Sequence, residues 1–490
     1  MELLFGGVVT SGFWLGVLQV IDLVLRILAL IVVPRNRKPT SGMAWLLAIF
    51  LLPVPGFLLF LLIGSPRLPK KRRDLQGRIN VILRDARDYL ERGSLRPNEP
   101  EWFSALVRMN RRLGALPISG DNGVELIDDY DESIARIAET ILGAQRYAHV
   151  EFYILKSDET TEPLFLALED ACARGVKVRV LLDFVANFTK PLRRQTAERL
   201  EAMGADWHYM LPLAPLKGKW QRPDLRNHRK LVIVDGDVAF IGSQNMVARN
   251  YNVRKNIKRD LKWMDVMVRL DGPVVASVDA VFHSDFFSET GVLLSDVDRE
   301  KTSGGTGDLD CQIVPSGPGF EAENNLRLFL GLLYGAKERV VMISPYFVPD
   351  ESLMQAVASA CSRGVEVQLL VSEISDQTMV YHAQRSYYET LLRAGVRIFA
   401  YEPPYILHTK SVTIDDEIAV IGSSNLDIRS FGLDLEISML VRGEEFASQV
   451  RRLEDDYKAH SVEITLQEWV KRPFRSQVLD NIFRLTSALQ

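Results

Sequence analysis

Apolar residues dominate the first part of the chain. Residues 12–34 form an apolar run that is long enough to cross a hydrocarbon core of ~30 Å as a helix. Asp22 and Arg26 lie inside the run, but they stand four residues apart, so on a helix they can neutralise each other. No basic stretch precedes the run and no small-residue cleavage site follows it, which favours a membrane helix over a cleaved signal peptide.

A second apolar run covers residues 43–64 and is interrupted by Pro53, Pro55 and Gly56. Such a run forms either a kinked span or a re-entrant hairpin. Basic residues flank both of its ends: Arg35, Arg37 and Lys38 before it, and Arg67, Lys70, Lys71, Arg72 and Arg73 after it. Because the second cluster is larger, the positive-inside rule predicts that the rest of the chain is cytoplasmic. A re-entrant hairpin would place both clusters on that same side.

From about residue 116 the pattern changes to alternating strands and helices. We expect a strand over 147–155, a helix over 161–174 and a buried strand over 176–183. The same order returns at 340–347, 350–363 and 365–372, and ACARGVKVRVLL from Ala171 aligns with ACSRGVEVQLLV from Ala360. The chain is therefore an internal duplication of one α/β domain, with helices on both faces of its sheets.

These patterns predict five segments. The expected boundaries are a membrane anchor over 1–66, a charged connector over 67–115, a first domain over 116–300, a linker over 301–308 and a second domain over 309–490. The linker is expected because TSGGTGD, from Thr302 to Asp308, is rich in glycine and small polar residues.

Composition excludes some classes of protein and site. The formal net charge of -4 argues against a dedicated nucleic-acid-binding protein. The three cysteines, Cys172, Cys311 and Cys361, show neither a disulfide framework nor the spacing of a zinc site. We expect them to be packing residues, because Cys172 and Cys361 stand at equivalent positions of the two copies.

Each copy carries the same polar motif. HRKLVIVDGDVAFIGSQN begins at His228 and HTKSVTIDDEIAVIGSSN begins at His408. Both read H-x-K, four residues, D, six residues, G-S-x-N, and the identical internal spacing makes an accidental match very improbable. The motif residues are His228, Lys230, Asp235, Ser243 and Asn245 in the first copy, and His408, Lys410, Asp415, Ser423 and Asn425 in the second.

The motif residues suit chemistry at a phosphodiester. The lysines and asparagines can neutralise its oxygens in the transition state. One histidine can attack phosphorus and form a phosphohistidine, while the other protonates the leaving alcohol and then deprotonates the incoming one. No metal-ligand cluster is evident, and this chemistry needs none. Asp235 and Asp415 follow the first strand of each motif, where they could either hold a histidine or anchor the hairpin.

These motifs resemble those of the phospholipase D superfamily, in which the H-K-D residues are catalytic. Five further stretches resemble the bacterial cardiolipin synthases within it: RNRKPTSGMAWLL from Arg35, EFYIL from Glu151, SGPGFEAENN from Ser316, PYFVPDESL from Pro345 and SSNLDIRSFGLDLE from Ser423. The resemblance covers essentially the whole chain. One residue departs from it: the family usually has Asn where this chain has Asp434, although the neighbouring Glu436 is kept.

The resemblance implies a fold, an activity and a location. The expected fold is two tandem phospholipase D-like α/β domains after an N-terminal transmembrane helical hairpin, in the bacterial inner membrane. The expected reaction is phosphatidyl transfer from one phosphatidylglycerol to another, with His228 as nucleophile and His408 as acid and base. It implies no cofactor, no metal and no nucleic acid. The expected substrate-binding residues are Ser243, Asn245, Ser423, Asn425 and Glu436.

Three other functions are compatible with parts of this sequence. A phospholipase D or another phosphatidyltransferase would use the same motifs. A membrane-tethered nuclease is opposed by the nearly neutral charge and by the lack of a basic aromatic track. An inactive lipid-binding scaffold is opposed by the completeness of both motifs.

Some polar residues lie outside the motifs. We expect His149, His208, His283, His382 and His460 to be packing or surface residues. Arg429 could bind phosphate or pair with Glu436, and the pair is favoured. The tail over 464–489 forms either a surface amphipathic helix or a helix packed on the second domain.

Overall fold

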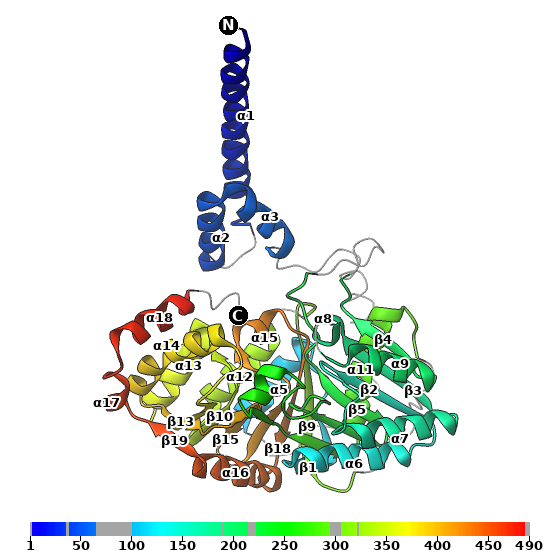
Figure 1. The fold of residues 1–490 in the computed structure, drawn as a ribbon. Helices are drawn as coiled ribbons and strands as arrows, with labels where there is room; N and C mark the ends of the chain where they lie inside the picture. Colours follow the sequence, from blue (N-terminus) through cyan, green and yellow to red (C-terminus); the bar gives the residue numbers. More distant parts are fainter. Residues whose placement is uncertain are drawn as a thin grey trace. The chain divides into compact units, whose positions relative to one another are not determined.

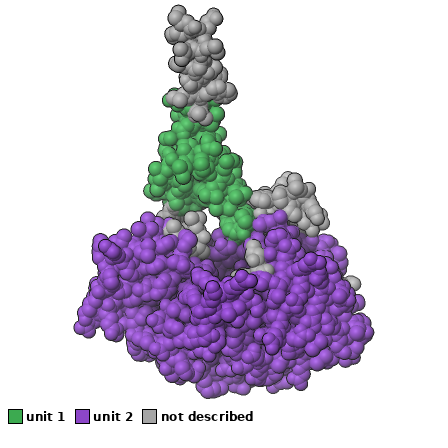
Figure 2. Space-filling model, in the orientation of Figure 1, with its two compact units in different colours: residues 1–69, 222–224 green, residues 70–221, 225–490 purple. Residues whose placement is uncertain are grey.

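The structure is a computed structural model that describes residues 2–35, 39–64, 100–188, 191–213, 222–294, 305–320 and 323–485. The chain forms two compact units (Figure 2). Unit 1 comprises residues 1–69 and 222–224, and unit 2 comprises residues 70–221 and 225–490. Most of the predicted connector lies outside the described residues, and its last part forms helix α5 (Glu101–Arg112).

The described residues of unit 1 form three helices, α1 (Glu2–Val32), α2 (Pro39–Leu51) and α3 (Pro53–Ile63). The predicted break in the second apolar run is confirmed at Leu52, because a proline begins α3. Gly56 lets α3 lie against α2: a Cβ there would stand only 2.7 Å from the Ala48 carbonyl oxygen. The expected Asp22–Arg26 pair is also confirmed, at 2.9 Å. Among the described residues, no helix combines the length and the apolar character that crossing a membrane requires.

Within its described residues, unit 2 is built on a fifteen-stranded sheet that contains both copies of the repeat (Figure 1). The first copy supplies, in spatial order, β4 (Asp206–Met210), β3 (Lys177–Asp183), β2 (Tyr147–Phe152), β5 (Lys230–Val234), β6 (Val238–Gly242), β8 (Met267–Asp271) and β1 (Ser119–Ile127). The second copy continues with β9 (Leu309–Ser316), β18 (Glu436–Arg442), β16 (Ile418–Gly422), β15 (Ser411–Ile414), β10 (Arg339–Ile343), β12 (Glu366–Ser372), β13 (Arg397–Tyr401) and β19 (Ser461–Ile464). Apart from β19, the two copies have mirrored strand orders about the β1–β9 pair.

The join between the copies is a short antiparallel pairing of β1 with β9, in which Ser119 stands opposite Cys311. The buried side chain of Asn122 fixes this join. Its amide nitrogen donates to the carbonyl oxygens of Ser119 and Leu309, at 2.7 and 2.9 Å. The described end of the predicted linker is held there too, since the Thr306 N–H donates to Asp271 Oδ1 at 2.6 Å. The two copies therefore share one continuous sheet.

Helices cover both faces of the sheet, as predicted. On one face α6 (Tyr130–Leu142) and α7 (Glu162–Ala173) cover the first copy, while α5, α12 (Asn324–Gly335), α13 (Glu351–Ser362) and α14 (Thr378–Ala394) cover the second. On the other face α11 (Val274–Thr290) and α16 (Glu444–Ala459) pack into one hydrophobic core that both copies share. Cys311 is buried in that core, and Cys172 and Cys361 are half-buried on α7 and α13.

Short elements complete unit 2. The short helices are α8 (Phe184–Phe188), α9 (Arg193–Ala202), α10 (Arg254–Lys258), α15 (Ile428–Gly432), α17 (Leu466–Trp469) and α18 (Phe474–Arg484). Within the described residues, two small parallel sheets lie outside the main one. They pair β7 (Lys262–Met264) with β14 (Tyr405–Leu407), and β11 (Phe347–Val348) with β17 (Leu426–Asp427).

Candidate active site

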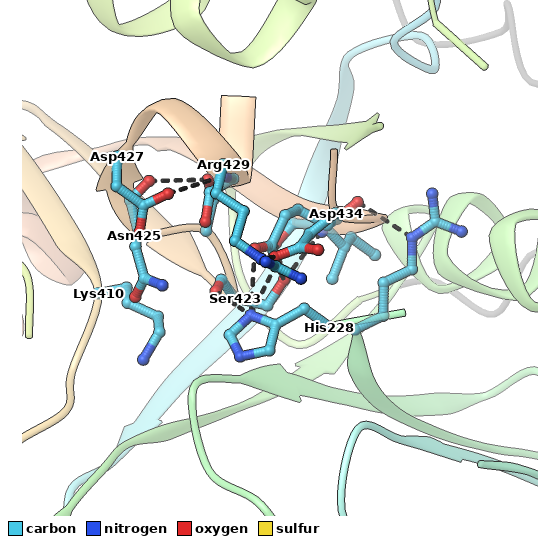
Figure 3. A network of polar contacts seen from close by, with 12 residues as sticks. His228, Lys410, Ser423, Asn425, Asp427, Arg429 and Asp434 are labelled. Carbon is cyan, nitrogen blue, oxygen red and sulfur yellow. Dashed lines mark hydrogen bonds and ion pairs between the residues drawn. The ribbon is translucent and has the colours of Figure 1, made fainter. Parts of the chain in front are cut away.

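His228 is positioned by a backbone contact between the two copies. Asn227 and Leu435 form an isolated parallel bridge, and the His228 N–H donates to the Leu435 carbonyl oxygen at 2.8 Å. This contact sets the imidazole beside the next residue, Glu436. Nδ1 lies 3.1 Å from both carboxylate oxygens of Glu436 and 3.1 Å from the Ser423 carbonyl oxygen (Figure 3).

His408 is positioned by an equivalent contact in the opposite direction. The parallel pair β7–β14 brings the residue after β7, Asp265, beside the residue after β14, His408. The His408 N–H donates to the Met264 carbonyl oxygen at 2.7 Å, and Nδ1 lies 2.7 Å from Asp265 Oδ1. Each histidine is thus held by a carboxylate from the other copy. With Nδ1 engaged in this way, Nε2 is the ring nitrogen left for chemistry.

Asp265 is a site residue that the sequence analysis missed. Asp265 corresponds to Glu436 of the other copy, as the contacts of the two motif serines show. The Ser243 hydroxyl accepts from Val266 N–H at 3.1 Å, and the Ser423 hydroxyl accepts from Ile437 N–H at 3.0 Å. The residue before each of these partners is the histidine's carboxylate, Asp265 or Glu436. The sequence signal is weak, because Asp265 stands 20 residues after Asn245 whereas Glu436 stands 11 residues after Asn425.

The two lysines lie beside the histidines. Each Nζ donates to the carbonyl oxygen of the histidine two residues earlier, at 2.5 Å in both copies. Burial, reinforced by the charge of Lys410, lowers the pKa of Lys230 to about 7. Burial also lowers the pKa of Lys410 to about 8. The two ammonium groups are therefore buried close enough to repel each other. A bound anion would relieve this repulsion, so the pair suits an anion-binding site.

The histidines and their partners are electrostatically linked to these lysines. Burial, followed by the charges of Lys230 and Lys410, lowers the pKa of His228 well below its usual value. Burial lowers the pKa of His408 to about 4, although Asp265 acts in the opposite direction. Burial raises the pKa of Glu436 to about 7, opposed by Lys230. Both imidazoles are consequently neutral at neutral pH, with a free lone pair on Nε2.

Asp235 and Asp415 lie at the far ends of their strands from the histidines, where they anchor the hairpins. The carboxylate of Asp235 accepts from the backbone N–H groups of Gln145, Arg146 and Tyr147 at 2.7 to 2.9 Å. That of Asp415 accepts from Lys337, Glu338 and Arg339 at 2.8 to 2.9 Å. Of the two roles that the sequence left open, the geometry supports anchoring the hairpin to the turn before β2 or β10.

The expected substrate-binding residues differ in their surroundings. The amide of Asn245 donates to the Tyr251 hydroxyl at 2.8 Å and accepts from Ile154 N–H at 3.2 Å. Ser423 donates to Glu436 Oε2 at 2.5 Å. These side chains, like Ser243, hold the site together. Asn425 is different, because its buried Oδ1 has no hydrogen-bond partner among the described residues.

Two tyrosines complete the symmetry of the site. The ring of Tyr153 meets His228 edge-on with centroids 4.8 Å apart, and Tyr346 meets His408 edge-on at 6.4 Å. They belong to the EFYIL and PYFVPDESL stretches and lie shortly after β2 and β10, the equivalent strands of the two copies. In the sequence these stretches only supported the resemblance to the family, and the two tyrosines were not predicted to lie at the site.

Arg429 pairs with a different carboxylate from the one expected. Its Nε lies 3.0 Å from Asp434 Oδ2 in an ion pair (Figure 3), so the favoured pairing with Glu436 is wrong. The second oxygen, Asp434 Oδ1, is buried and has no hydrogen-bond partner within the part of the chain that the structure describes. Burial raises the pKa of Asp434, opposed by Arg429, and its negative charge acts on His228. The residue that departs from the family pattern therefore lies at the site.

A second polar cluster lies in the first copy. His149, Asp279 and His283 have ligand-type atoms within 4.8 Å of one another, an arrangement that the sequence analysis did not foresee. Internal contacts occupy much of it: His149 Nδ1 lies 2.9 Å from Asp279 Oδ1 and its Nε2 lies 3.0 Å from Arg179 Nη1. The ring of His149 also stacks between Tyr147 and Phe282. For His149, the expectation of a packing histidine is confirmed.

Known proteins with similar sequences span nearly the whole chain. The family model described as cardiolipin synthase, PLD-like domain, matches residues 137–284 and 329–456, and one described as phospholipase D-nuclease N-terminal matches residues 24–65. The chain is 33% identical over 503 residues to cardiolipin synthase A of Serratia proteamaculans, covering 98% of this chain and 97% of that protein. It is 32% identical over 473 residues to cardiolipin synthase A of Proteus mirabilis (94% of each) and 30% identical over 500 residues to cardiolipin synthase of Geobacillus kaustophilus (98% and 96%).

A solved structure supports the fold. Phosphatidylserine synthase of Haemophilus influenzae superposes with a TM-score of 0.61 at 16% identity, covering 79% of this chain and all of that one. The two matched segments of the PLD-like model fall one in each copy of the repeat, and together they exceed half of the chain. With both H-K-D motifs complete and its relatives matched from end to end, the chain belongs to the cardiolipin synthase family of phospholipase D-like proteins.

Proposed function

We propose that this protein transfers a phosphatidyl group from one phosphatidylglycerol to a second, which yields cardiolipin and glycerol. One observation carries the proposal: two histidines, each held through Nδ1 by a carboxylate of the other copy, face the same pair of buried lysines. A phosphodiester bound there would have one histidine available for attack and a second available for the proton.

In the first step, Nε2 of His228 attacks phosphorus and forms a P–N bond. The P–O bond to the glycerol headgroup breaks, and its oxygen takes a proton from His408, so free glycerol leaves. The bound phosphodiester adds a negative charge beside His408 and raises its pKa, which favours the protonated form that this step needs. Lys230 and Lys410 neutralise the charge on the phosphoryl oxygens.

In the second step, a headgroup hydroxyl of another phosphatidylglycerol loses its proton to His408. The resulting oxygen attacks phosphorus, the P–N bond breaks, and His228 recovers its lone pair. Glu436 and Asp265 stabilise the positive charge that each imidazole acquires in turn, as an orienting carboxylate does in other two-step transfers. The assignment of His228 as nucleophile follows the family. It is tested by quenching turnover without acid and mapping the labelled peptide.

We further propose that unit 1 is a membrane anchor, multi-pass or re-entrant, in the bacterial inner membrane, with unit 2 cytoplasmic. Large apolar side chains are exposed on α1, α2 and α3, including Leu23, Ile31, Met43, Leu47, Leu58 and Leu61. Apolar surface of that extent is rare on soluble monomers. The two copies, over 116–300 and 309–490, would form the catalytic body. Removing residues 1–66 is expected to weaken membrane binding, and dispersing the substrate in detergent is expected to restore much of the activity.

The decisive experiment uses purified full-length protein in detergent with phosphatidylglycerol as the sole lipid. The expected products are cardiolipin and glycerol in equal amounts. Phosphatidic acid in place of cardiolipin would identify a phospholipase D. Transfer to another alcohol at the expense of cardiolipin would identify a different phosphatidyltransferase.

A further inference from the structure

Helix α18 packs on α14 with its acidic residue inside. Asp480 is 1% exposed and lies 2.7 Å from His382 Nδ1 and 2.6 Å from Arg472 Nη1. The ring of Phe483 stacks on His382 with centroids 5.3 Å apart. Because a buried carboxylate is costly unless its partners stay in place, these contacts fix the rotation of α18 about its axis.

The opposite side of α18 is apolar and exposed. Phe474, Val478 and Ile482 recur every four residues, so they lie on one face, which Leu479 and Leu485 extend. All five are exposed, from 37% for Val478 to 85% for Leu485. A helix on a water-soluble surface normally shows the reverse polarity, with its carboxylate outside and its large apolar side chains inside.

The charges that accompany this apolar face are positive. Lys471, Arg475 and Arg484 are exposed on or next to α18, whereas Asp480, the acidic residue of its sequence, is buried. An apolar face flanked by cations is the pattern of a helix that lies in the headgroup layer of a membrane with anionic lipids. A second protein copy would require no such excess of positive charge.

We propose that the outward face of α18 inserts into the headgroup layer of an anionic phospholipid bilayer and forms a lipid contact of unit 2 itself. The inference deepens the proposed function and in part rests on it, because the substrate proposed above is an anionic lipid. The sequence left two alternatives for the tail, a surface amphipathic helix or a helix packed on the second domain. With this proposal α18 is both, because one face packs on α14 and the opposite face contacts lipid.

Helix α14 connects this proposed lipid contact to the candidate active site. On its other side, Gln384 of α14 accepts from the N–H of Phe347 at 2.8 Å, and Phe347 follows Tyr346, the tyrosine beside His408. In Figure 1, α18, α15 and α8 lie along the same side of unit 2, and α15 carries Arg429 of the site. A bilayer that binds α18 would therefore lie on the side of unit 2 that carries site residues.

The test places an environment-sensitive fluorophore on the full-length protein in lipid nanodiscs. Val478→Cys is labelled in a background of Cys172→Ala and Cys361→Ala, while Cys311 stays because it is fully buried. Leu142→Cys, on α6 at a comparably exposed position, is the matched control. The nanodiscs contain phosphatidylcholine alone or an equal mixture with phosphatidylglycerol, and a nitroxide on the acyl chains is the quencher. Circular dichroism checks that both labelled proteins keep their fold.

In the anionic discs we expect the nitroxide to quench the Val478 label at least about fivefold more than the Leu142 label. We expect the Val478 label to be quenched less in discs of phosphatidylcholine alone than in the anionic discs. Equal quenching of the two labels, or equal quenching of Val478 in both lipids, overturns the proposal. A blue-shifted Val478 label without nitroxide quenching also overturns it, in favour of a protein surface covering α18. The readout needs no turnover, so a protein that docks but makes no cardiolipin would refute the proposed function and leave this inference standing.

Discussion

His408 and Asp265 belong to opposite copies of the repeat, yet Nδ1 of the histidine lies 2.7 Å from Oδ1 of the aspartate. His228 and Glu436 make the reciprocal contact at 3.1 Å. Neither copy can complete its own histidine site, because the orienting carboxylate always comes from the other. This exchange explains why the shared sheet and the short cross-copy ladders matter for the chemistry.

Replacing either histidine should abolish transfer while the protein stays folded. His228→Ala removes the nucleophile and His408→Ala removes the proton donor, so neither residue can substitute for the other. Cardiolipin formation from phosphatidylglycerol in detergent is the measurement, with circular dichroism as the check on folding. His460→Ala, at an exposed histidine beyond α16, is the matched control and should keep normal activity. Substantial synthesis by either motif variant would refute the two-histidine mechanism.

Glu436→Gln and Asp265→Asn should each lower kcat by about 100-fold or more, because an amide does not stabilise the imidazolium and can favour the wrong tautomer. Glu454→Gln is the control: Glu454 is also buried, but it bonds to Arg339 and Thr413. That variant should lower the melting temperature and leave kcat largely intact. If it impaired kcat as much as the other two, the cross-copy contacts would have no special role.

Asp235→Ala and Asp415→Ala should reduce stability more than catalysis. Each removes the acceptor of three backbone N–H groups, which should lower the free energy of unfolding by about 2 kcal/mol. Thermal melting followed by circular dichroism measures the loss. Asp237→Ala, in the same turn as Asp235, is expected to melt close to wild type. A kcat near zero in the folded Asp235→Ala protein would show that this residue takes part in the chemistry.

The two lysines should set an alkaline limit to activity. Binding of the phosphodiester needs them charged, and their pKa values in the free site are about 7 and about 8. kcat/KM should therefore fall as the pH rises through this range. Lys230 has the lower pKa and loses its charge first, so it sets the limit. Arginine stays protonated in this range, so Lys230→Arg should move the fall toward about 8, where Lys410 loses its charge, whatever it does to the maximum rate. Lys410→Arg is the control and should leave the limit set by Lys230 in place. If the alkaline limb did not move in Lys230→Arg, the limb would belong to another group.

Asp434→Asn tests the residue that departs from the family pattern. The negative charge of Asp434 favours the protonated form of His228, so its removal should lower the pKa of His228 further. Because attack needs neutral His228, the acidic limb of kcat/KM should move to lower pH. The amide still offers an oxygen to Arg429, so folding should persist. A limb that moves to higher pH would contradict this account of the site's electrostatics.

The local sequence pattern was sufficient to predict many features of this protein. The break at Leu52, the strand–helix–strand order of both copies and the two motifs depend on neighbouring residues along the chain, and all can be found in the sequence. Proline, hydrophobic period and fixed spacing act over a few residues, so no tertiary information is needed to identify them.

Tertiary structure alone decided which residues meet. It joined β1 to β9 so that the two copies share one sheet, and it placed Asp265 beside His408, 143 residues away. It also placed the Asp235 carboxylate where it accepts hydrogen bonds from the backbone before β2, and it paired Arg429 with Asp434 in place of Glu436. These contacts arise when sheets, helices and short ladders pack as one body. A spacing along the chain specifies which side chains one strand presents, but packing determines which side chains of another copy face them.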